Sequence, residues 1–197
     1  GHNTGKKIFL RKSARKTWGV FELFVTIEDN WVPPDNFQEQ TEEELAHRTS
    51  PTYIGLSLLA GLTASDVGYI TTGQFIELTS HTISTMEKME RYKGHFYNWY
   101  DTESLDTLFP KYISTVDSGN LAGHLLVLRQ GLRAIPHQEI QILQLFKGLM
   151  DTLRVLEDTS NANDIKLLRQ INIDLQEING SKIYTLIEIK NKVESMV

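Results

Sequence analysis

The segment SPTYIGLSLLAGLTASDVG, residues 50–68, decides the fold class of this chain. Ser50 is a favoured helix N-cap, and Pro51 takes the first helical position, where its missing N–H group costs nothing. Apolar side chains then recur at helical spacing up to Gly68, and they include Ile54, Leu58, Leu59 and Leu62. The segment therefore predicts a well-buried helix.

Six other segments repeat this helical spacing of apolar side chains. They are residues 8–27, 75–94, 118–132, 138–156, 163–178 and 181–196. Asp117 and Ser118 are the predicted caps of the fourth helix, and Pro136 lies just past its end. No heptad is sustained, so we expect a mainly α fold of antiparallel helical hairpins rather than a coiled coil.

The connections between these helices differ in length in a regular way. About twenty residues join the first helix to the second and about twenty-five join the third to the fourth, whereas the links after the second, fourth and sixth helices are short. Because consecutive helices alternate in direction, both long loops are expected at one end, where binding residues commonly lie. In the second long loop, residues 94–101 and 111–116 flank a polar turn and predict a short β-hairpin.

Composition bounds the organisation and the partners of the chain. With 40% hydrophobic residues in 197 positions, the chain can bury one substantial core. We expect residues 1–6 to be a disordered tag remnant and residues 7–197 to form a single helical domain. The net charge of −5 argues against nucleic acid as a partner. There is no cysteine, and the histidines lack metal-ligand spacing, so neither a metal site nor a cofactor is expected.

The two long loops carry aromatic side chains interleaved with acids, amides and an arginine. A pyranose presents apolar C–H faces that stack on aromatic rings, and hydroxyl groups that take paired hydrogen bonds. This pattern is therefore typical of sugar recognition. The candidate substrate-binding residues are Trp31, Asp35, Asn36, Arg48, Tyr97, Trp99 and Asp101 in the loops, and Asp117, Ser118 and Asn120 at the start of the fourth helix.

Glycoside chemistry requires two carboxyl groups, and the long loops offer Asp35, Glu39, Asp101 and Asp117. Each has a structural alternative: Asp117 as a helix cap, Asp35 and Asp101 as acceptors of loop amide or sugar hydroxyl hydrogens. Trp31 and Trp99 could likewise plug the end of the helical core. The sequence thus leaves the catalytic acid and the nucleophile unassigned.

Four stretches, in order, resemble a known family: residues 30–39, 47–52, 94–102 and 114–125. Together they are similar to the glucoamylase-like middle region of cyclic β-1,2-glucan synthases, over about residues 8–130. The resemblance implies an (α/α)6 toroid that closes linear β-1,2-glucan into a ring by transglycosylation. It also implies a large parent protein at the cytoplasmic face of a bacterial inner membrane. Tyr53 departs from the family pattern, which usually has Asn there.

A complete toroid of that kind needs nearly twice this length, so the resemblance implies that the chain is the N-terminal, carbohydrate-binding half. The family's catalytic acids are then expected in the other half, and the isolated chain is expected to be inactive. The implied partners are β-1,2-glucan or a related glucose polymer and the remaining domains of the parent, with self-association through exposed helix faces. Two alternatives stay open, a non-catalytic glycan-binding module and a helical protein-interaction module.

Overall fold

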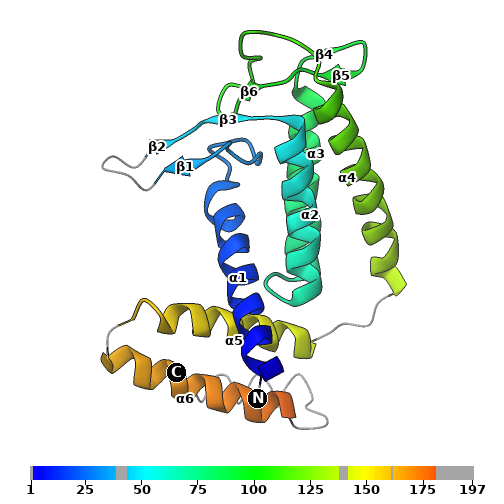
Figure 1. The fold of residues 1–197 in the computed structure, drawn as a ribbon. Helices are drawn as coiled ribbons and strands as arrows, with labels where there is room; N and C mark the ends of the chain where they lie inside the picture. The colour runs from blue at the N-terminus through cyan, green and yellow to red at the C-terminus, as the bar shows by residue number, and fades with distance from the viewer. Residues whose placement is uncertain (1, 39–43, 138–141, 161, 181–197) are drawn as a thin grey trace. The chain divides into compact units, whose positions relative to one another are not determined.

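The computed structural model describes residues 2–38, 44–137, 142–160 and 162–180, and within these ranges it contains six α-helices (Figure 1). The helices are α1 (His2–Phe24), α2 (Pro51–Val67), α3 (Thr72–Lys88), α4 (Thr115–Ala134), α5 (Ile142–Glu157) and α6 (Ala162–Gly180). A 3-10 helix, Ile135–His137, follows α4. The mainly α prediction is confirmed, whereas the half-toroid arrangement stays a prediction. The predicted helix over residues 181–196 lies outside the described residues.

The described strands form three two-stranded antiparallel sheets. Their strands are β1 (Phe37–Gln38) with β2 (Glu44–Leu45), β3 (Arg48–Thr49) with β6 (Tyr100–Asp101), and β4 (Arg91–Tyr92) with β5 (His95–Phe96). Contacts divide the chain into two compact units: unit 1 contains residues 1–16, 67–69 and 140–197, and unit 2 contains residues 17–66 and 70–139. The predicted single domain over residues 7–197 stays a prediction.

In unit 2, α2 forms where the sequence predicts it. The Ser50 hydroxyl accepts a hydrogen bond from the backbone N–H of Tyr53, and Gly68 ends the helix with a φ of +86°. Glycines on α2 and α4 allow close packing, because a Cβ at Gly55 would lie only 2.5 Å from the His124 ring of α4. Phe75 of α3 is fully buried beside Gly61 of α2, so α2 packs against both α3 and α4 (Figure 1).

The starts of α3 and α4 follow their capping groups. Thr71 and Gln74 form a reciprocal capping box, so α3 begins at Thr72. The predicted cap of α4 is wrong: Ser114 is the N-cap, and its hydroxyl accepts from the backbone N–H of Asp117. Asp117 and Ser118 therefore lie within the first turn, and the Asp117 carboxylate is available for another partner.

The first helix begins earlier and ends earlier than the predicted residues 8–27. It spans His2–Phe24. The expectation of a tag remnant over residues 1–6 stays a prediction. Beyond it, the backbone N–H of Trp31 donates to the carbonyl of Thr26, and Asn30 and Trp31 adopt φ values of 50° and 61°. This tight turn breaks the helical hydrogen bonding that apolar periodicity alone would continue.

A hairpin exists between α3 and α4, but its strands are not the predicted ones. β4 and β5 pair around Lys93 and Gly94, whose φ values of 49° and 88° suit a tight two-residue turn. Residues 100–101 pair with β3 instead, and residues 111–116 form no strand. The hairpin is therefore local, whereas the neighbouring strand is recruited by a distant segment.

Unit 1 has its own core between α5 and α6. Its buried members are Phe146, Met150, Leu153 and Leu175, with Ile142, Leu168 and Ile171 packed against them. At Gly148, a Cβ would lie 1.9 Å from the backbone oxygen of Gly68, so the two backbones touch directly. Asp151 is fully buried and accepts from Arg11 at 2.6 Å and from Arg154 at 3.0 Å.

Candidate functional site

The two long loops meet through the β3–β6 ladder, at the end where α2 and α4 begin (Figure 1). Arg48 pairs with Asp101, and Thr49 pairs with Tyr100. The backbone N–H of Thr102 also donates to the carbonyl of His47 at 3.1 Å. The expectation that both loops lie at one end of the helices is thus confirmed, and the ladder places Arg48 close to Trp99.

Arg48 is held between an acid and an aromatic ring. Its Nε and Nη2 atoms donate to Oδ2 of Asp35 at 2.9 and 2.6 Å. Its guanidinium carbon lies 4.9 Å from the Trp99 ring centroid, a cation–π distance. The Asp35 side chain is 10% exposed while that of Arg48 is 50% exposed. The guanidinium therefore faces solvent, and the more buried carboxylate of Asp35 fixes its position.

Tyr53 completes this aromatic group. Its ring centroid lies 6.1 Å from that of Trp99, with the planes tilted by 42°. A hydrogen bond to Asp35, followed by partial burial, raises the pKa of Tyr53 above its ordinary value. Asp35 therefore accepts from both Arg48 and Tyr53, and one carboxylate orients two neighbours of Trp99.

Polar side chains from the first turns of α2 and α4 continue the group. Thr52 donates its hydroxyl hydrogen to Oδ1 of Asp117 at 2.5 Å, and the amide of Asn120 donates to the Thr52 hydroxyl at 3.2 Å. Asp117 also acts electrostatically on Tyr53, which follows Thr52 directly. We call the combined set the polar–aromatic strip; it consists of Asp35, Arg48, Thr52, Tyr53, Trp99, Asp117 and Asn120.

The remaining sequence candidates have other described contacts. Trp31 stacks on His81 of α3, with centroids 4.6 Å apart and planes 13° from parallel, and its carbonyl accepts from Thr82. Asp101 accepts from the backbone N–H groups of Glu103 and Ser104, which is the structural alternative considered for it. These interactions fix the loops, and none joins Trp31 or the Asp101 carboxylate to the strip.

Three further candidates contribute backbone groups or ring contacts. The carbonyl of Asn36 accepts from Ala46, and the N–H of Ser118 belongs to the first turn of α4. The Tyr97 ring lies 5.6 Å from Nζ of Lys111. Glu39 lies outside the described residues. The structure thus joins Asp35, Arg48, Trp99, Asp117 and Asn120, and it adds Thr52 and Tyr53, which sequence reasoning did not select.

A group of hydrogen-bonded side chains, which the sequence did not reveal, joins the two loops. We call this group, which consists of Asp29, Asn30, His47 and Thr102, the clasp. Asp29 is 4% exposed; it accepts from Nδ1 of His47 at 2.8 Å and from the hydroxyl of Thr102. The amide of Asn30 donates to the carbonyls of Thr102 and Glu103 at 2.9 and 2.7 Å. Asp29 and Asn30 resemble ordinary turn residues in sequence, so only the fold shows that they tie the two loops together.

The clasp predicts a pH-dependent stability. The hydrogen bond to Asp29 raises the pKa of His47 above its ordinary value of about 6.5, against the opposing effect of desolvation. Because the folded pKa lies above the unfolded one, this contribution is complete below about pH 6.5 and is lost as the pH rises through the folded value. Urea unfolding between about pH 5.5 and 8.5 should therefore show stability falling with pH, and His47→Gln should flatten this trend.

The matched control is His137→Gln, an exposed histidine at the other end of α4. This variant should retain the wild-type pH dependence. An unchanged slope in His47→Gln would contradict the role assigned to the clasp.

The described part of the chain thus defines a class: a mainly helical protein with a polar–aromatic strip where two loops meet the first turns of α2 and α4. No protein-family model matches the chain. It is 41% identical over 173 residues to the cyclic beta-(1,2)-glucan synthase NdvB of Rhizobium meliloti (strain 1021). The match covers 85% of this chain and 6% of that protein. The chain therefore belongs to the cyclic β-(1,2)-glucan synthase family, and it corresponds to a small fragment of the matched protein.

The family resemblance predicted from the four sequence stretches is confirmed by this match. Among the described helices, none combines the length and the apolar character needed to cross a bilayer. The predicted location of the parent at an inner membrane stays a prediction.

Proposed function

We propose that this chain supplies part of the glucan-binding surface of a cyclic β-1,2-glucan synthase, and that the polar–aromatic strip is the contact surface. Family membership supports the substrate class, and the grouping of Trp99, Tyr53, Arg48 and Asp35 supports the location. The single observation that carries the proposal is the placement of Arg48 between Asp35 and Trp99.

The strip offers the two kinds of contact that a sugar ring requires. Trp99 and Tyr53 provide aromatic surface for pyranose C–H faces. Arg48 uses Nε and Nη2 for Asp35, which leaves Nη1 as a donor to a sugar hydroxyl. The second carboxylate oxygen of Asp117 is an acceptor beside the Thr52 hydroxyl. Donors and acceptors fixed side by side suit paired hydroxyl groups.

The carboxylates of the strip are better suited to positioning than to proton transfer. Asp35 is paired with Arg48 and bonded to Tyr53, and Asp117 accepts from Thr52. We therefore propose that the catalytic acids lie elsewhere in the parent protein, where this chain forms half of an (α/α)6 domain for transglycosylation. The isolated chain is then expected to bind glucan without turning it over.

Binding and its dependence on Trp99 test the proposal. Calorimetric titration with linear β-1,2-gluco-oligosaccharides should show binding, and Trp99→Ala should raise the Kd by about tenfold or more because a stacking surface and the partner of Arg48 are lost. Phe109→Ala is the control, since Phe109 is 87% exposed and lies outside the strip. Wild-type affinity in Trp99→Ala would refute the strip as the binding surface.

The competing classes predict different outcomes in the same assays. A helical protein-interaction module would bind no oligosaccharide at any concentration tested. A glycan-binding module without a catalytic role would bind, but the full parent domain would be no more active than the isolated chain. Ring closure of linear glucan by the full domain, together with binding by this chain, is the result expected here.

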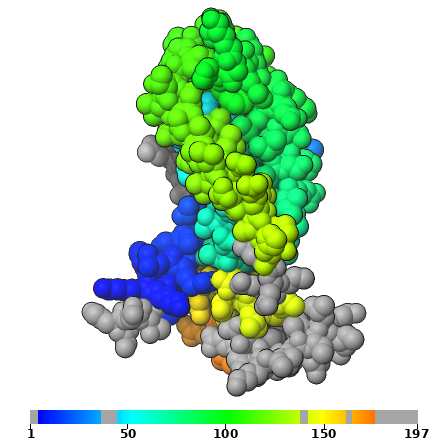
Figure 2. Space-filling model, turned by 90° about the vertical axis from the view of Figure 1, so that its right-hand side faces the viewer, coloured from blue at the N-terminus to red at the C-terminus, as the bar shows by residue number. Residues whose placement is uncertain are grey.

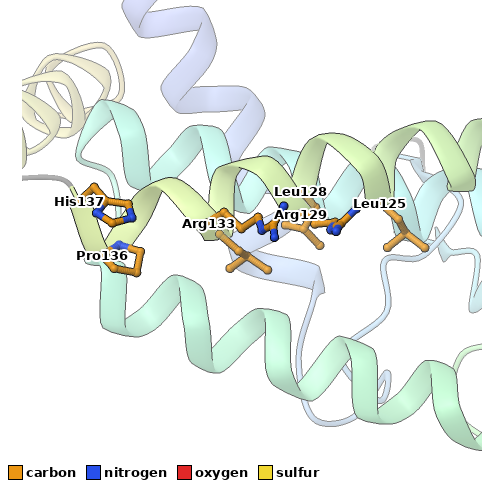
Figure 3. A pocket seen from close by; sticks show the side chains of 7 residues that line it. Leu125, Leu128, Arg129, Arg133, Pro136 and His137 are labelled. Atoms are coloured by element: carbon orange, nitrogen blue, oxygen red, sulfur yellow. The ribbon is translucent and has the colours of Figure 1, made fainter.

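We further propose that α4 contacts other domains of the parent. A shallow cavity of about 640 Å³ lies along α4 and the following 3-10 turn, and Figure 3 shows its lining side chains on α4. They are Leu125, Leu128, Arg129, Leu132, Arg133, Pro136 and His137. Exposed apolar side chains elsewhere on α4 include Val116, Leu126 and Val127. Figure 2 shows α4, in yellow-green, running along the visible face of unit 2.

Exposed apolar side chains such as Val116, Leu126 and Val127, beside an open cavity, are typical of an interaction surface. In the absence of the remaining domains, it also supports the proposal that the isolated chain self-associates. Light scattering at high protein concentration should then give a mass above that of the monomer. A monomer mass at every concentration would contradict self-association. The proposed contact of α4 with other domains of the parent would then remain.

A further inference from the structure

Unit 1 contains a second concavity whose lining differs in chemistry from the strip. Its volume is about 410 Å³, and its lining residues come from α1 and α5. They are Lys7, Ile8, Arg11, Gln144, Lys147, Met150 and Arg154. Four of these seven side chains are cationic, which is unusual in a chain with a net charge of −5.

The helices bring the cations together by their spacing. Lys7 and Arg11 are four residues apart on α1, so they share a face of that helix. Lys147 and Arg154 are seven residues apart on α5 and also share a face. Each of the two helices therefore contributes two cations to the cavity. Helical spacing, rather than chance proximity on the surface, brings them together.

In the described part of the chain, Asp151 is the acid that forms ion pairs with these cations, and its single negative charge neutralises only one of them. It accepts from Nε of Arg11 and from Nη1 of Arg154, and it is fully buried beside the cavity. Nζ of Lys147 has a neutral partner, the amide oxygen of Gln144 at 3.4 Å. The cavity thus retains an excess of positive charge that the described acids do not balance.

One donor at this cavity is buried and unsatisfied. Among the described residues, Nη2 of Arg11 has no hydrogen-bond partner and is shielded from solvent, although Nε of the same guanidinium is bound to Asp151. A buried guanidinium N–H without an acceptor is unfavourable, and so is the approach of several like charges. A multivalent anion in the cavity would relieve the repulsion between the like charges, and rotation of the Arg11 guanidinium toward the anion would give Nη2 an acceptor.

We propose that this cavity binds a phosphate group carried by an organic molecule. Arg11 and Arg154 would supply directed N–H donors, and Lys7 and Lys147 would supply charge. Ile8 and Met150 form an apolar part of the lining, against which the organic portion of the ligand would lie. The phosphate could belong to a soluble ester or to a lipid headgroup, which share this chemistry.

The site is independent of the proposed glucan contact, because it uses different residues in the other compact unit. The test uses the full chain at constant ionic strength, which keeps general charge screening fixed. The probes are glucose 6-phosphate with glucose as its uncharged counterpart, and vesicles of phosphatidylcholine with or without phosphatidic acid. Calorimetry measures the soluble probes, and sedimentation measures the vesicles.

Lys147→Gln should weaken binding of the phosphate probe by about tenfold, the effect of losing one charge-assisted contact. Lys7→Gln should weaken it similarly. Lys166→Gln is the matched control, because Lys166 is an exposed lysine of α6 outside the cavity. Circular dichroism melting verifies that each variant is folded.

Selective binding of glucose 6-phosphate over glucose would support a soluble ester, and selective binding to phosphatidic acid vesicles would support a lipid headgroup. The proposal is overturned if neither phosphate probe binds at millimolar concentration. It is also overturned if Lys166→Gln loses as much affinity as Lys147→Gln, since the attraction would then depend on overall charge alone.

Discussion

Gly148→Ala is expected to destabilise unit 1 by about 3 kcal/mol or more, one of the two largest effects predicted for this protein. An added Cβ would lie 1.9 Å from the backbone oxygen of Gly68 and 2.4 Å from its carbonyl carbon. These are main-chain atoms, so no side-chain rotation can relieve the overlap. Gly68 is equally constrained, because its φ is +86° and its own Cβ would meet the Gln144 oxygen at 2.0 Å.

Urea unfolding followed by circular dichroism would measure this effect. Gly119→Ala provides the control, since a Cβ at Gly119 in α4 would have no atom within 4 Å. Alanine is the better helix former, so that variant should be neutral or slightly more stable. Equal stability of the two variants would show that the α5 backbone can move away from Gly68 without cost.

Tyr100→Phe is expected to lower the free energy of unfolding by about 2 kcal/mol or more. Tyr100 is fully buried; its hydroxyl donates to the carbonyl of Glu90 at 2.6 Å and accepts from the N–H of Tyr97 at 2.8 Å. Burial raises the pKa of Tyr100 to about 12. Removing one oxygen atom leaves two backbone groups without their partner.

Chemical denaturation of the Tyr100→Phe and Tyr92→Phe variants would test this expectation. Tyr92 is 52% exposed, so loss of its hydroxyl should change stability by no more than about 0.5 kcal/mol. Tyr100 pairs with Thr49 in the ladder, so loss of the backbone contacts that its hydroxyl makes should also weaken the proposed glucan contact. Equal stability of the two variants would mean that water replaces the lost hydroxyl.

The helices could be predicted because their determinants are local. For α2, Ser50 caps the start, Pro51 fits the first turn and Gly68 permits the left-handed residue at the end. All three lie within a single segment of sequence. Apolar periodicity located the other described helices for the same reason, and α6, predicted at residues 163–178, extends over Ala162–Gly180.

The cap of α4 shows where local reasoning is ambiguous. Ser114 and Asp117 are both good N-cap residues, and an acid is also favoured three positions inside a helix by the helix dipole. The sequence is consistent with either assignment. The structure selects Ser114 as the cap, and Asp117 then accepts from Thr52 of α2. That tertiary contact is not encoded in the local pattern.

Some residues of the candidate site could be predicted from the sequence, but their connections could not. Aromatic and acidic side chains identified the two loops, and the structure brings together Asp35, Arg48 and Trp99. The β3–β6 register joins segments far apart in sequence, so no local pattern specifies it. For the same reason, the stacking of Trp31 on His81 could not be anticipated.

The β3–β6 ladder has a consequence for how the strip is assembled. In the sequence, α2 and α3 lie between its two strands. Pairing the strands therefore closes a long loop and costs chain entropy. The packing of the two enclosed helices brings the loop ends together and offsets that cost. A shortened protein that kept both loop sequences but lacked this helix pair would retain Asp35, Arg48 and Trp99 and lose the arrangement that brings them together.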